Sequence, residues 1–242
     1  MECKDTEFVS AIIVAGGSGK RLGRDIRKQY IKLGEYTILG HTLRIFTELA
    51  EVCEIIVVVP PEDVAFVRDE LLRDELGEYL HSKPISVVAG GAERQDSVRA
   101  GIEAINPNSN LVMIHDAARP FAQKSHIRKA LQKASECGGA ILAVPVKDTL
   151  KRCAVGGAVA ETVLREGLYA AQTPQVFGVD KIRYAHNWAI SQSITVTDDA
   201  MLFEQLGYEV ALVESSHLNI KITTEEDLLL ARLIIEGIHE KH

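Results

Sequence analysis

Short runs of β-branched and aliphatic residues alternate along this chain with segments whose apolar residues have helical spacing. The runs predict strands over 9–15, 54–60, 85–89, 110–116, 140–146, 208–214 and 218–222. The intervening segments predict helices over 38–50, 62–73, 93–105, 124–136, 179–191, 198–206 and 224–240. Because such alternation is typical of βα units around one sheet, we expect an α/β fold with three layers and a mostly parallel sheet.

One segment, 147–174, interrupts this alternation. It contains two short β-like pieces around Gly156 and Gly157 and no helix of useful length, which predicts a protruding β-hairpin arm. The 242 residues together fit a single domain over 1–242, with the segment 147–174 as its arm. An exposed strand edge needs cover, so both a free hairpin and a hairpin packed on a partner subunit stay open.

Composition excludes several classes of protein. The longest strongly apolar run, 55–59, is too short to span a bilayer, and the first residues have no signal-peptide core. A formal net charge of −7 argues against nucleic acid as the main partner. We expect reduced thiols in the cytoplasm, with no zinc site or disulfide framework, because the cysteines are widely spaced: Cys3, Cys53, Cys137 and Cys153.

A basic, glycine-rich loop follows the first predicted strand. Residues 20–32 hold six bases and one acid, a local charge of +5 in an otherwise acidic chain. A small basic focus on an acidic body suits a compact polyanion such as the phosphates of a nucleotide, and a solvated basic loop is the alternative. Glycines at a strand end let successive backbone N–H groups approach an anion.

Two familiar phosphate-binding motifs do not fit this loop. The dinucleotide motif Gly-x-Gly-x-x-Gly fails because Leu22 stands where its third glycine belongs. The P-loop motif fails because Val14 replaces its first glycine and Arg21 replaces its serine or threonine. The remaining hypothesis is a loop that binds a triphosphate through its backbone, with help from bases that follow it.

Several sequence blocks, in their order, resemble one family. AGGSGKR (15–21) followed by KQY (28–30) resembles the sugar-phosphate nucleotidyltransferases. The match narrows to the 2-C-methyl-D-erythritol 4-phosphate cytidylyltransferases with GGAERQDSVRAG (90–101), HDAARPF (115–121), PVKDTLKR (145–152), QTPQVF (172–177), TDDA (197–200) and NIKIT (219–223). The resemblance implies a nucleotidyltransferase fold and transfer of a cytidylyl group from CTP to a polyol phosphate, with release of pyrophosphate.

The same resemblance implies roles for individual residues. The nucleotide would lie against Ala15, Gly16, Gly17, Gly19, Gly91 and Ser97. The charge of the reacting phosphates would be stabilised by Arg21, Lys28 and Lys221, and Asp116 would hold Mg2+. The acceptor would contact Thr149, Arg165, Thr173 and Thr197. The arm over 147–174 would cross to the other subunit of a homodimer and help to build its active site.

Without the resemblance, other interpretations of these residues stay open. Residues 93–98 read as a helix start, and Asp116 at a strand end could cap a turn as well as hold a metal. A lone lysine at a strand end, such as Lys221, is usually solvated. We expect His115 to be packed rather than catalytic, because the transfer needs no histidine nucleophile.

Two departures and two rivals accompany the resemblance. The family usually has proline before Lys28, where this chain has Arg27, which we interpret as solvated or supporting. The family also tends to have a carboxylate shortly before Asn219, where this chain has His217 and Leu218. Ribitol-5-phosphate cytidylyltransferase shares the fold, but its loop commonly has valine where Ala118 stands, so Ala118 favours the erythritol substrate. A non-catalytic nucleotide-binding protein is the other rival, and the intact set of charged residues argues against it.

Overall fold

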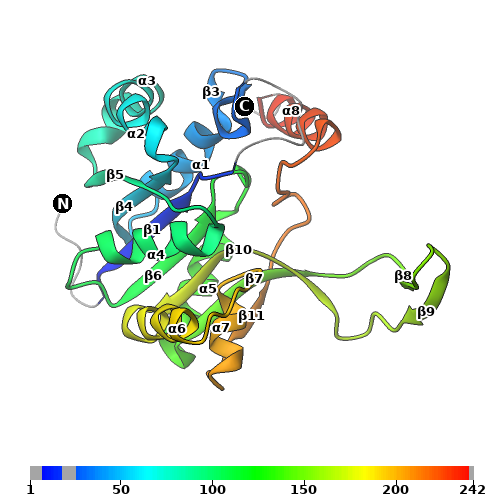
Figure 1. Cartoon of the computed structure of the whole chain (residues 1–242). Helices are drawn as coiled ribbons and strands as arrows, with labels where there is room; N and C mark the ends of the chain where they lie inside the picture. The colour runs from blue at the N-terminus through cyan, green and yellow to red at the C-terminus, as the bar shows by residue number, and fades with distance from the viewer. Residues whose placement is uncertain (1–6, 18–25, 240–242) are drawn as a thin grey trace.

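A computed structural model describes residues 7–17 and 26–239, apart from the side chains of residues 78, 238 and 239. Its seven-stranded central sheet has the order β11-β7-β10-β6-β1-β4-β5 (Figure 1). The strands are β1 (Val9–Val14), β4 (Val52–Val59), β5 (Ile85–Ala89), β6 (Leu111–Asp116), β7 (Gly139–Pro145), β10 (Tyr169–Gly178) and β11 (Ala211–Glu214). All neighbouring pairs are parallel except those of β10, which runs antiparallel to β6 and β7. The mostly parallel sheet is therefore confirmed.

Helices cover both faces of this sheet. One face packs on α1 (Ile38–Thr47), α5 (Lys124–Cys137) and a helical run of η3 (Pro61–Asp63), α2 (Val64–Phe66), η4 (Val67–Leu71) and α3 (Leu72–Leu76). The other packs on α4 (Arg94–Ala104), α6 (Val179–Ser191) and α7 (Ala200–Gln205). Successive strand residues point to opposite faces, so Ile13 joins the first core and Ile12 the second. Burial on both faces explains why the central strands are apolar throughout.

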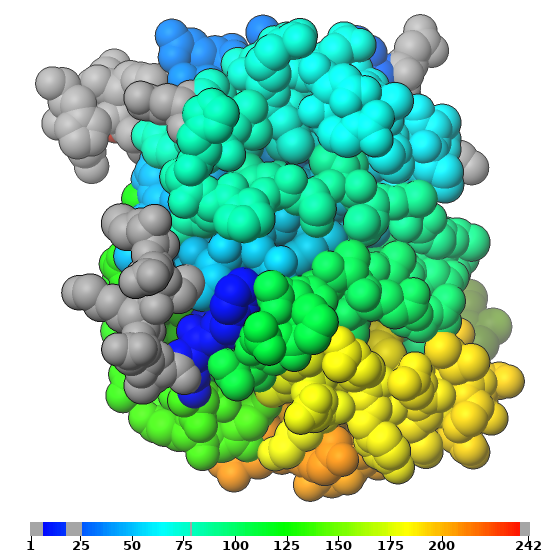
Figure 2. All heavy atoms as spheres, turned by 90° about the vertical axis from the view of Figure 1, so that its left-hand side faces the viewer, coloured from blue at the N-terminus to red at the C-terminus, as the bar shows by residue number. Residues whose placement is uncertain are grey.

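A third, smaller core lies beside the sheet. It joins α8 (Glu225–His239) to the hairpin of β2 (Lys32–Leu33) and β3 (Tyr36–Thr37), through Leu33, Ile222, Leu228 and Ala231. The short turn η2 (Lys28–Tyr30) precedes β2. Figure 2 shows the side of the body that lies at the left of Figure 1, with the 61–76 segment (cyan) at the top and α6 (yellow) near the bottom. None of the described helices is long and apolar enough to cross a membrane.

The arm extends away from the body between β7 and β10 (Figure 1). It carries β8 (Leu150–Cys153) and β9 (Val159–Val163), an antiparallel pair with Leu150 opposite Val163. Every residue from 147 to 162 is exposed. The hairpin predicted over 147–174 is thus present, although the chain re-enters the central sheet already at Tyr169, as the start of β10.

Three expectations differ from the structure. Residues 218–222 form no strand; the segment instead crosses to the loop after β6, where the Ile222 amide donates to the Ala118 carbonyl at 2.9 Å. β10 was hidden in the sequence because its middle, residues 172–174, is an irregularity in the pairing with β7. The expectation of reduced thiols is wrong at Cys53, which is disulfide-bonded, whereas Cys137 and Cys153 are free. The spacing of the cysteines along the chain could not reveal that Cys53 is disulfide-bonded.

Candidate active site

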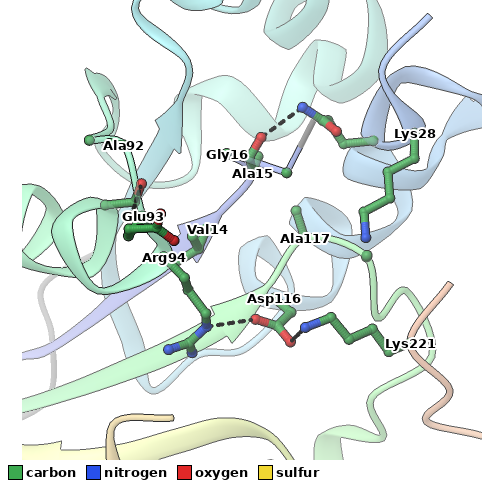
Figure 3. Close-up of a pocket in the computed structure, with 15 residues that line it drawn as sticks. Val14, Ala15, Gly16, Lys28, Ala92, Glu93, Arg94, Asp116, Ala117 and Lys221 are labelled. Carbon is green, nitrogen blue, oxygen red and sulfur yellow. Dashed lines mark hydrogen bonds and ion pairs between the residues drawn. The ribbon is translucent and has the colours of Figure 1, made fainter. Parts of the chain in front are cut away.

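A cavity of about 330 Å3 opens at the carboxyl ends of β1 and β6. From β1 the chain moves outward to β4 and β5 and then returns to β6 on the other side of β1, so this is the point where strand order reverses. Open α/β sheets bind ligands at such points. The lining comes from segments 14–17, 28–29, 91–94 and 116–118, together with Ser97 and Lys221 (Figure 3).

The turn η2 faces the glycine loop across this cavity. The Gln29 amide donates to the Ala15 carbonyl at 2.7 Å, and the Lys28 ammonium donates to the Ile222 carbonyl at 3.3 Å. A Cβ built on Gly17 would lie 3.4 Å from Lys28 Cε, so the lysine stem passes over the glycine loop. The sequence separates these groups, and the fold brings a cation next to a backbone suited to phosphate.

Asp116 forms the charged centre of the pocket floor. Its Oδ2 lies 2.8 Å from Lys221 Nζ and 3.7 Å from Arg119 Nε, and its Oδ1 accepts from Arg94 Nε at 3.3 Å. Burial would raise the pKa of Asp116, but Lys221 and Arg94 hold it well below its usual range. Figure 3 shows the ammonium groups of Lys28 and Lys221 turned toward the interior of the pocket. The site therefore holds a permanent carboxylate among cations.

Arg94 connects this floor to a second buried carboxylate. Its Nη1 donates to Asp199 Oδ2 at 2.7 Å, and Asp199 Oδ1 lies 3.1 Å from His186 Nε2. Burial would lower the pKa of Arg94, but Asp199 and Asp116 raise it, so the guanidinium stays charged. Its Nη2 is buried without a hydrogen-bond partner in the described part of the chain. Arg94 is thus a fixed positive bridge beneath the pocket.

The start of α4 forms another wall. Glu93 and Asp96 make a capping box, and the hydroxyl of Ser97 donates to the Glu93 carbonyl at 3.2 Å. A Cβ at Gly91 would lie only 2.3 Å from Asp96 Cβ, so the wall requires glycine there. Residues 93–98 are therefore a helix start, and three of them, Glu93, Arg94 and Ser97, also line the pocket, so the two interpretations from the sequence do not exclude each other.

His115 supports the floor from below and is fully buried. Its Nε2 lies 3.0 Å from the Arg119 carbonyl, which can only accept, so Nε2 donates. Nδ1 therefore accepts from the Thr173 hydroxyl at 3.0 Å, and that hydroxyl in turn accepts from the Asp116 amide at 3.1 Å. Burial lowers the pKa of His115 to about 4. A neutral histidine with both nitrogens engaged confirms that the residue is packed.

The pocket gathers most of the residues expected for nucleotide and catalysis: Ala15, Gly16, Gly17, Lys28, Gly91, Ser97, Asp116 and Lys221. It does not gather the residues expected to bind the acceptor. Thr149 and Arg165 are exposed on the arm, Thr197 is exposed between α6 and α7, and Thr173 is buried beneath Asp116. Gly19 and Arg21 lie outside the described residues.

Sequence reasoning missed two features of this site. Gln29 lines the pocket while 1% exposed, and only its position inside the KQY block could have signalled it. The other is the bridge that Arg94 makes between Asp116 and Asp199. The second aspartate of the TDDA block was the available signal, because a carboxylate that is fully buried needs a cationic or hydrogen-bonding partner.

Comparisons with known proteins agree over nearly the whole chain. The model of the 2-C-methyl-D-erythritol 4-phosphate cytidylyltransferase family matches residues 9–237. The protein of that name from Alkaliphilus oremlandii is 43% identical over 231 residues, 96% of each chain. The one from Halalkalibacterium halodurans is 45% identical over 230 residues, 93% of this chain and 96% of the relative.

A solved structure agrees with these relatives. The 4-diphosphocytidyl-2C-methyl-D-erythritol synthase from Anaerococcus prevotii superposes with a TM-score of 0.81 at 32% identity, covering 95% of this chain and 99% of that one. Sequence and structure therefore give the same assignment over the same residues. The chain belongs to the 2-C-methyl-D-erythritol 4-phosphate cytidylyltransferase family.

Proposed function

We propose that this chain transfers the cytidylyl group of CTP to 2-C-methyl-D-erythritol 4-phosphate and releases pyrophosphate. The observation that carries the proposal is the convergence of Lys28, Asp116 and Lys221 on one pocket beside the glycine loop, in a chain of this family. A phosphate oxygen of the acceptor attacks the α-phosphorus in line. The new P–O bond forms as the bond to the bridging oxygen breaks, and the electron pair leaves with pyrophosphate.

Charge stabilisation and positioning account for the catalysis in this proposal. The acceptor phosphate is already ionised near neutral pH, so the reaction needs no general base. Three cations line the described part of the pocket, Lys28, Arg94 and Lys221, and we propose that Lys28 and Lys221 stabilise the developing charge. Arg21 keeps its proposed role at the triphosphate. The nucleotide would lie along Ala15–Gly17 and Gly19, with its base toward Gly91 and Ser97.

We propose Asp116 as the residue that holds Mg2+. Among the described residues no group of three or more His, Cys, Asp or Glu side chains is placed to hold a metal ion. A single carboxylate such as that of Asp116 fits an ion shared with substrate, because Mg2+ is commonly bound by one or two carboxylates together with substrate phosphates. When bound, the ion would neutralise phosphate charge.

A homodimer with exchanged arms is our proposal for the acceptor side. Thr149 and Arg165 lie on the exposed arm, away from the pocket of their own chain, which supports a role in a neighbouring subunit. Apolar side chains on the arm are also exposed, among them Val155, Val159 and Leu164. Thr197 would contact the acceptor directly, whereas Thr173 would act through the hydrogen bond that it accepts from the Asp116 amide.

The deciding experiment measures pyrophosphate release from each nucleoside triphosphate with Mg2+, against a panel of polyol phosphates. Release that requires CTP together with 2-C-methyl-D-erythritol 4-phosphate supports the proposal. Activity restricted to ribitol 5-phosphate would move the substrate to that alcohol. Tight CTP binding with no release from any acceptor would indicate a non-catalytic nucleotide-binding protein.

We also propose a cytoplasmic location, where nucleoside triphosphates are maintained. The disulfide at Cys53 is unusual for such a compartment, which keeps most thiols reduced. Cell fractionation followed by immunodetection tests the location, and thiol labelling of the cytoplasmic fraction tests whether Cys53 is oxidised there. Recovery of the protein outside the cytoplasm would overturn this part of the proposal.

A further inference from the structure

The turn that carries Lys28 is held at both ends by one carboxylate. Arg27 Nε lies 3.1 Å from Asp63 Oδ2, and the Tyr30 hydroxyl donates to the same oxygen at 2.9 Å. Arg27 also forms an ion pair with Glu62 through Nη2. Because Arg27 and Tyr30 flank Lys28 and Gln29, Asp63 Oδ2 closes a bracket around the turn. We refer to Arg27, Asp63 and Tyr30 as the turn bracket.

The carboxylate in this bracket has a firm base. Asp63 ends η3, directly after β4, and its amide donates to the Pro60 carbonyl at 2.9 Å. Pro60 and Pro61 restrict the backbone there, since the ring of proline fixes φ. Tyr30 is fixed by its ring as well, which packs edge-on against Phe66 with centroids 5.4 Å apart. The bracket therefore ties the turn to the end of a buried central strand.

The two inner residues of the turn point the other way. Gln29 is hydrogen-bonded to Ala15 at the end of β1, and Lys28 extends into the pocket toward Ile222. The turn is thus attached to β4 on one side and to β1 on the other. A lysine stem has four rotatable carbons, so the placement of its ammonium depends on how firmly its backbone is held.

The backbone angles at Arg27 are ones that a proline would fix by its ring. Its φ of −60° and ψ of 138° are values that proline adopts without strain. Arginine does not fix φ, so an outside contact must. We propose that Asp63 is a positioning residue for the cytidylyl transfer: by holding Arg27 and Tyr30 it fixes the turn and thereby the Lys28 ammonium. This inference rests on the proposed function.

Two other roles for Arg27 give different results. If its guanidinium bound phosphate directly, its charge would be needed for catalysis. If the bracket were only a surface ion pair, its loss would change little, since partly exposed pairs contribute about 0–1 kcal/mol. The variants R27A, R27P, R27K and D63A separate the three roles. The matched control is D69A, which removes the exposed Arg68–Asp69 pair on the same helical run.

For each variant, kcat and the KM for CTP are measured by pyrophosphate release, and folding by thermal unfolding. We expect D63A and R27A to lower kcat about 10–100-fold, because small misplacements of a reacting group have effects of this size. KM should change less, and D69A should match the wild type. R27P should recover most of the R27A loss, since it restores the fixed φ without the ion pair.

Three results would overturn the inference. One is a wild-type kcat in D63A, and another is R27P as slow as R27A while R27K is fully active. A second readout does not depend on turnover: the rate at which an amine-reactive ester labels Lys28, relative to Lys221, by mass spectrometry. D63A should raise that ratio, and an unchanged ratio is the third overturning result. An inactive wild type with a raised ratio would contradict the proposed function but keep the bracket.

Discussion

One strand, β10, joins the arm to the pocket floor, but the floor is buried and the arm is exposed. Asp116 is buried, with three cations and a backbone contact around it. Leu164 on the arm is 84% exposed, and the described arm consists of a two-stranded hairpin without a core of its own. β10 begins at the end of the arm, at Tyr169, and its Thr173 accepts a hydrogen bond from the Asp116 amide.

The two regions differ in whether contacts within the chain fix the positions of their side chains. The floor is fixed within the chain, because every charge there has a partner close by in the fold. An isolated two-stranded hairpin is only marginally stable in water, and exposed apolar side chains gain free energy only against another surface. Contacts within the chain therefore fix the floor, whereas residues 147–162 of the arm are all exposed.

The largest effect should come from the pocket. Lys28→Ala should lower kcat about 100–1000-fold with the fold intact, because loss of one group that stabilises developing charge has effects of this order. Steady-state pyrophosphate release checks the rate, and circular dichroism checks the fold. Lys32→Ala, an exposed base nearby, is the matched control. A turnover within threefold of the wild type would remove Lys28 from the mechanism and weaken the contrast with the arm.

The buried floor should also respond to pH. His115 has a pKa of about 4 in the folded chain, against about 6.5 when unfolded, so only the unfolded state takes up a proton between these values. Stability is then lost as pH falls from about 6.5 toward 4, by up to about 3 kcal/mol. Urea unfolding at several pH values should show this slope in the wild type and less of it in His115→Asn. The exposed His217→Asn is the control, and equal slopes in all three would contradict the assignment.

An intermediate effect is expected from the arm. Leu164→Asp should raise the dissociation constant of the homodimer at least about tenfold, because it places a charge on an apolar contact. Analytical ultracentrifugation over a concentration series measures it. Leu229→Asp, on the exposed face of α8, is the matched control and should leave association unchanged. If the wild type is monomeric at micromolar concentration, the proposed arm exchange is wrong.

The smallest effect should be on stability at the arm tip. In the dissociated Leu164→Asp background Val155 should be fully exposed, as it is in the single chain, so Val155→Ser should change the free energy of unfolding there by less than about 0.5 kcal/mol. Val57→Ala in the buried centre of β4 should cost about 2–3 kcal/mol. Denaturant unfolding compares the two directly. A large loss at Val155 would mean that the arm stabilises its own chain, which would erase the difference drawn above.

Local patterns predicted the parts of the fold that local forces determine. Apolar periodicity located the main strands and helices, and it predicted the hairpin around Gly156 and Gly157. The pairing of β10 between β6 and β7 depends on contacts between distant residues, and it was not visible. Lys221 shows the same limit, because the segment expected as a strand is an irregular crossing that brings this lysine to Asp116.

The candidate site was predictable where the sequence resembles the family, and less so at Arg27, where the sequence departs from the family pattern. The resemblance placed Lys28, Asp116 and Lys221 together, and the fold agrees. Arg27 had no counterpart and was interpreted as solvated or supporting. Its partners, Glu62 and Asp63, lie on another strand end, so only the folded chain shows the bracket.

The strand order has a consequence for synthesis of the protein. The four strands of the central sheet that come first along the chain, β1, β4, β5 and β6, are adjacent in the finished sheet and mutually parallel. A chain leaving the ribosome can therefore assemble four of the seven strands of this sheet, with Gly16, Gly17 and Asp116 at their carboxyl ends, before the arm exists. Lys221 is the last pocket residue to emerge. A chain that has made only these four strands therefore holds Asp116 together with Arg94 and Arg119, but still without Lys221.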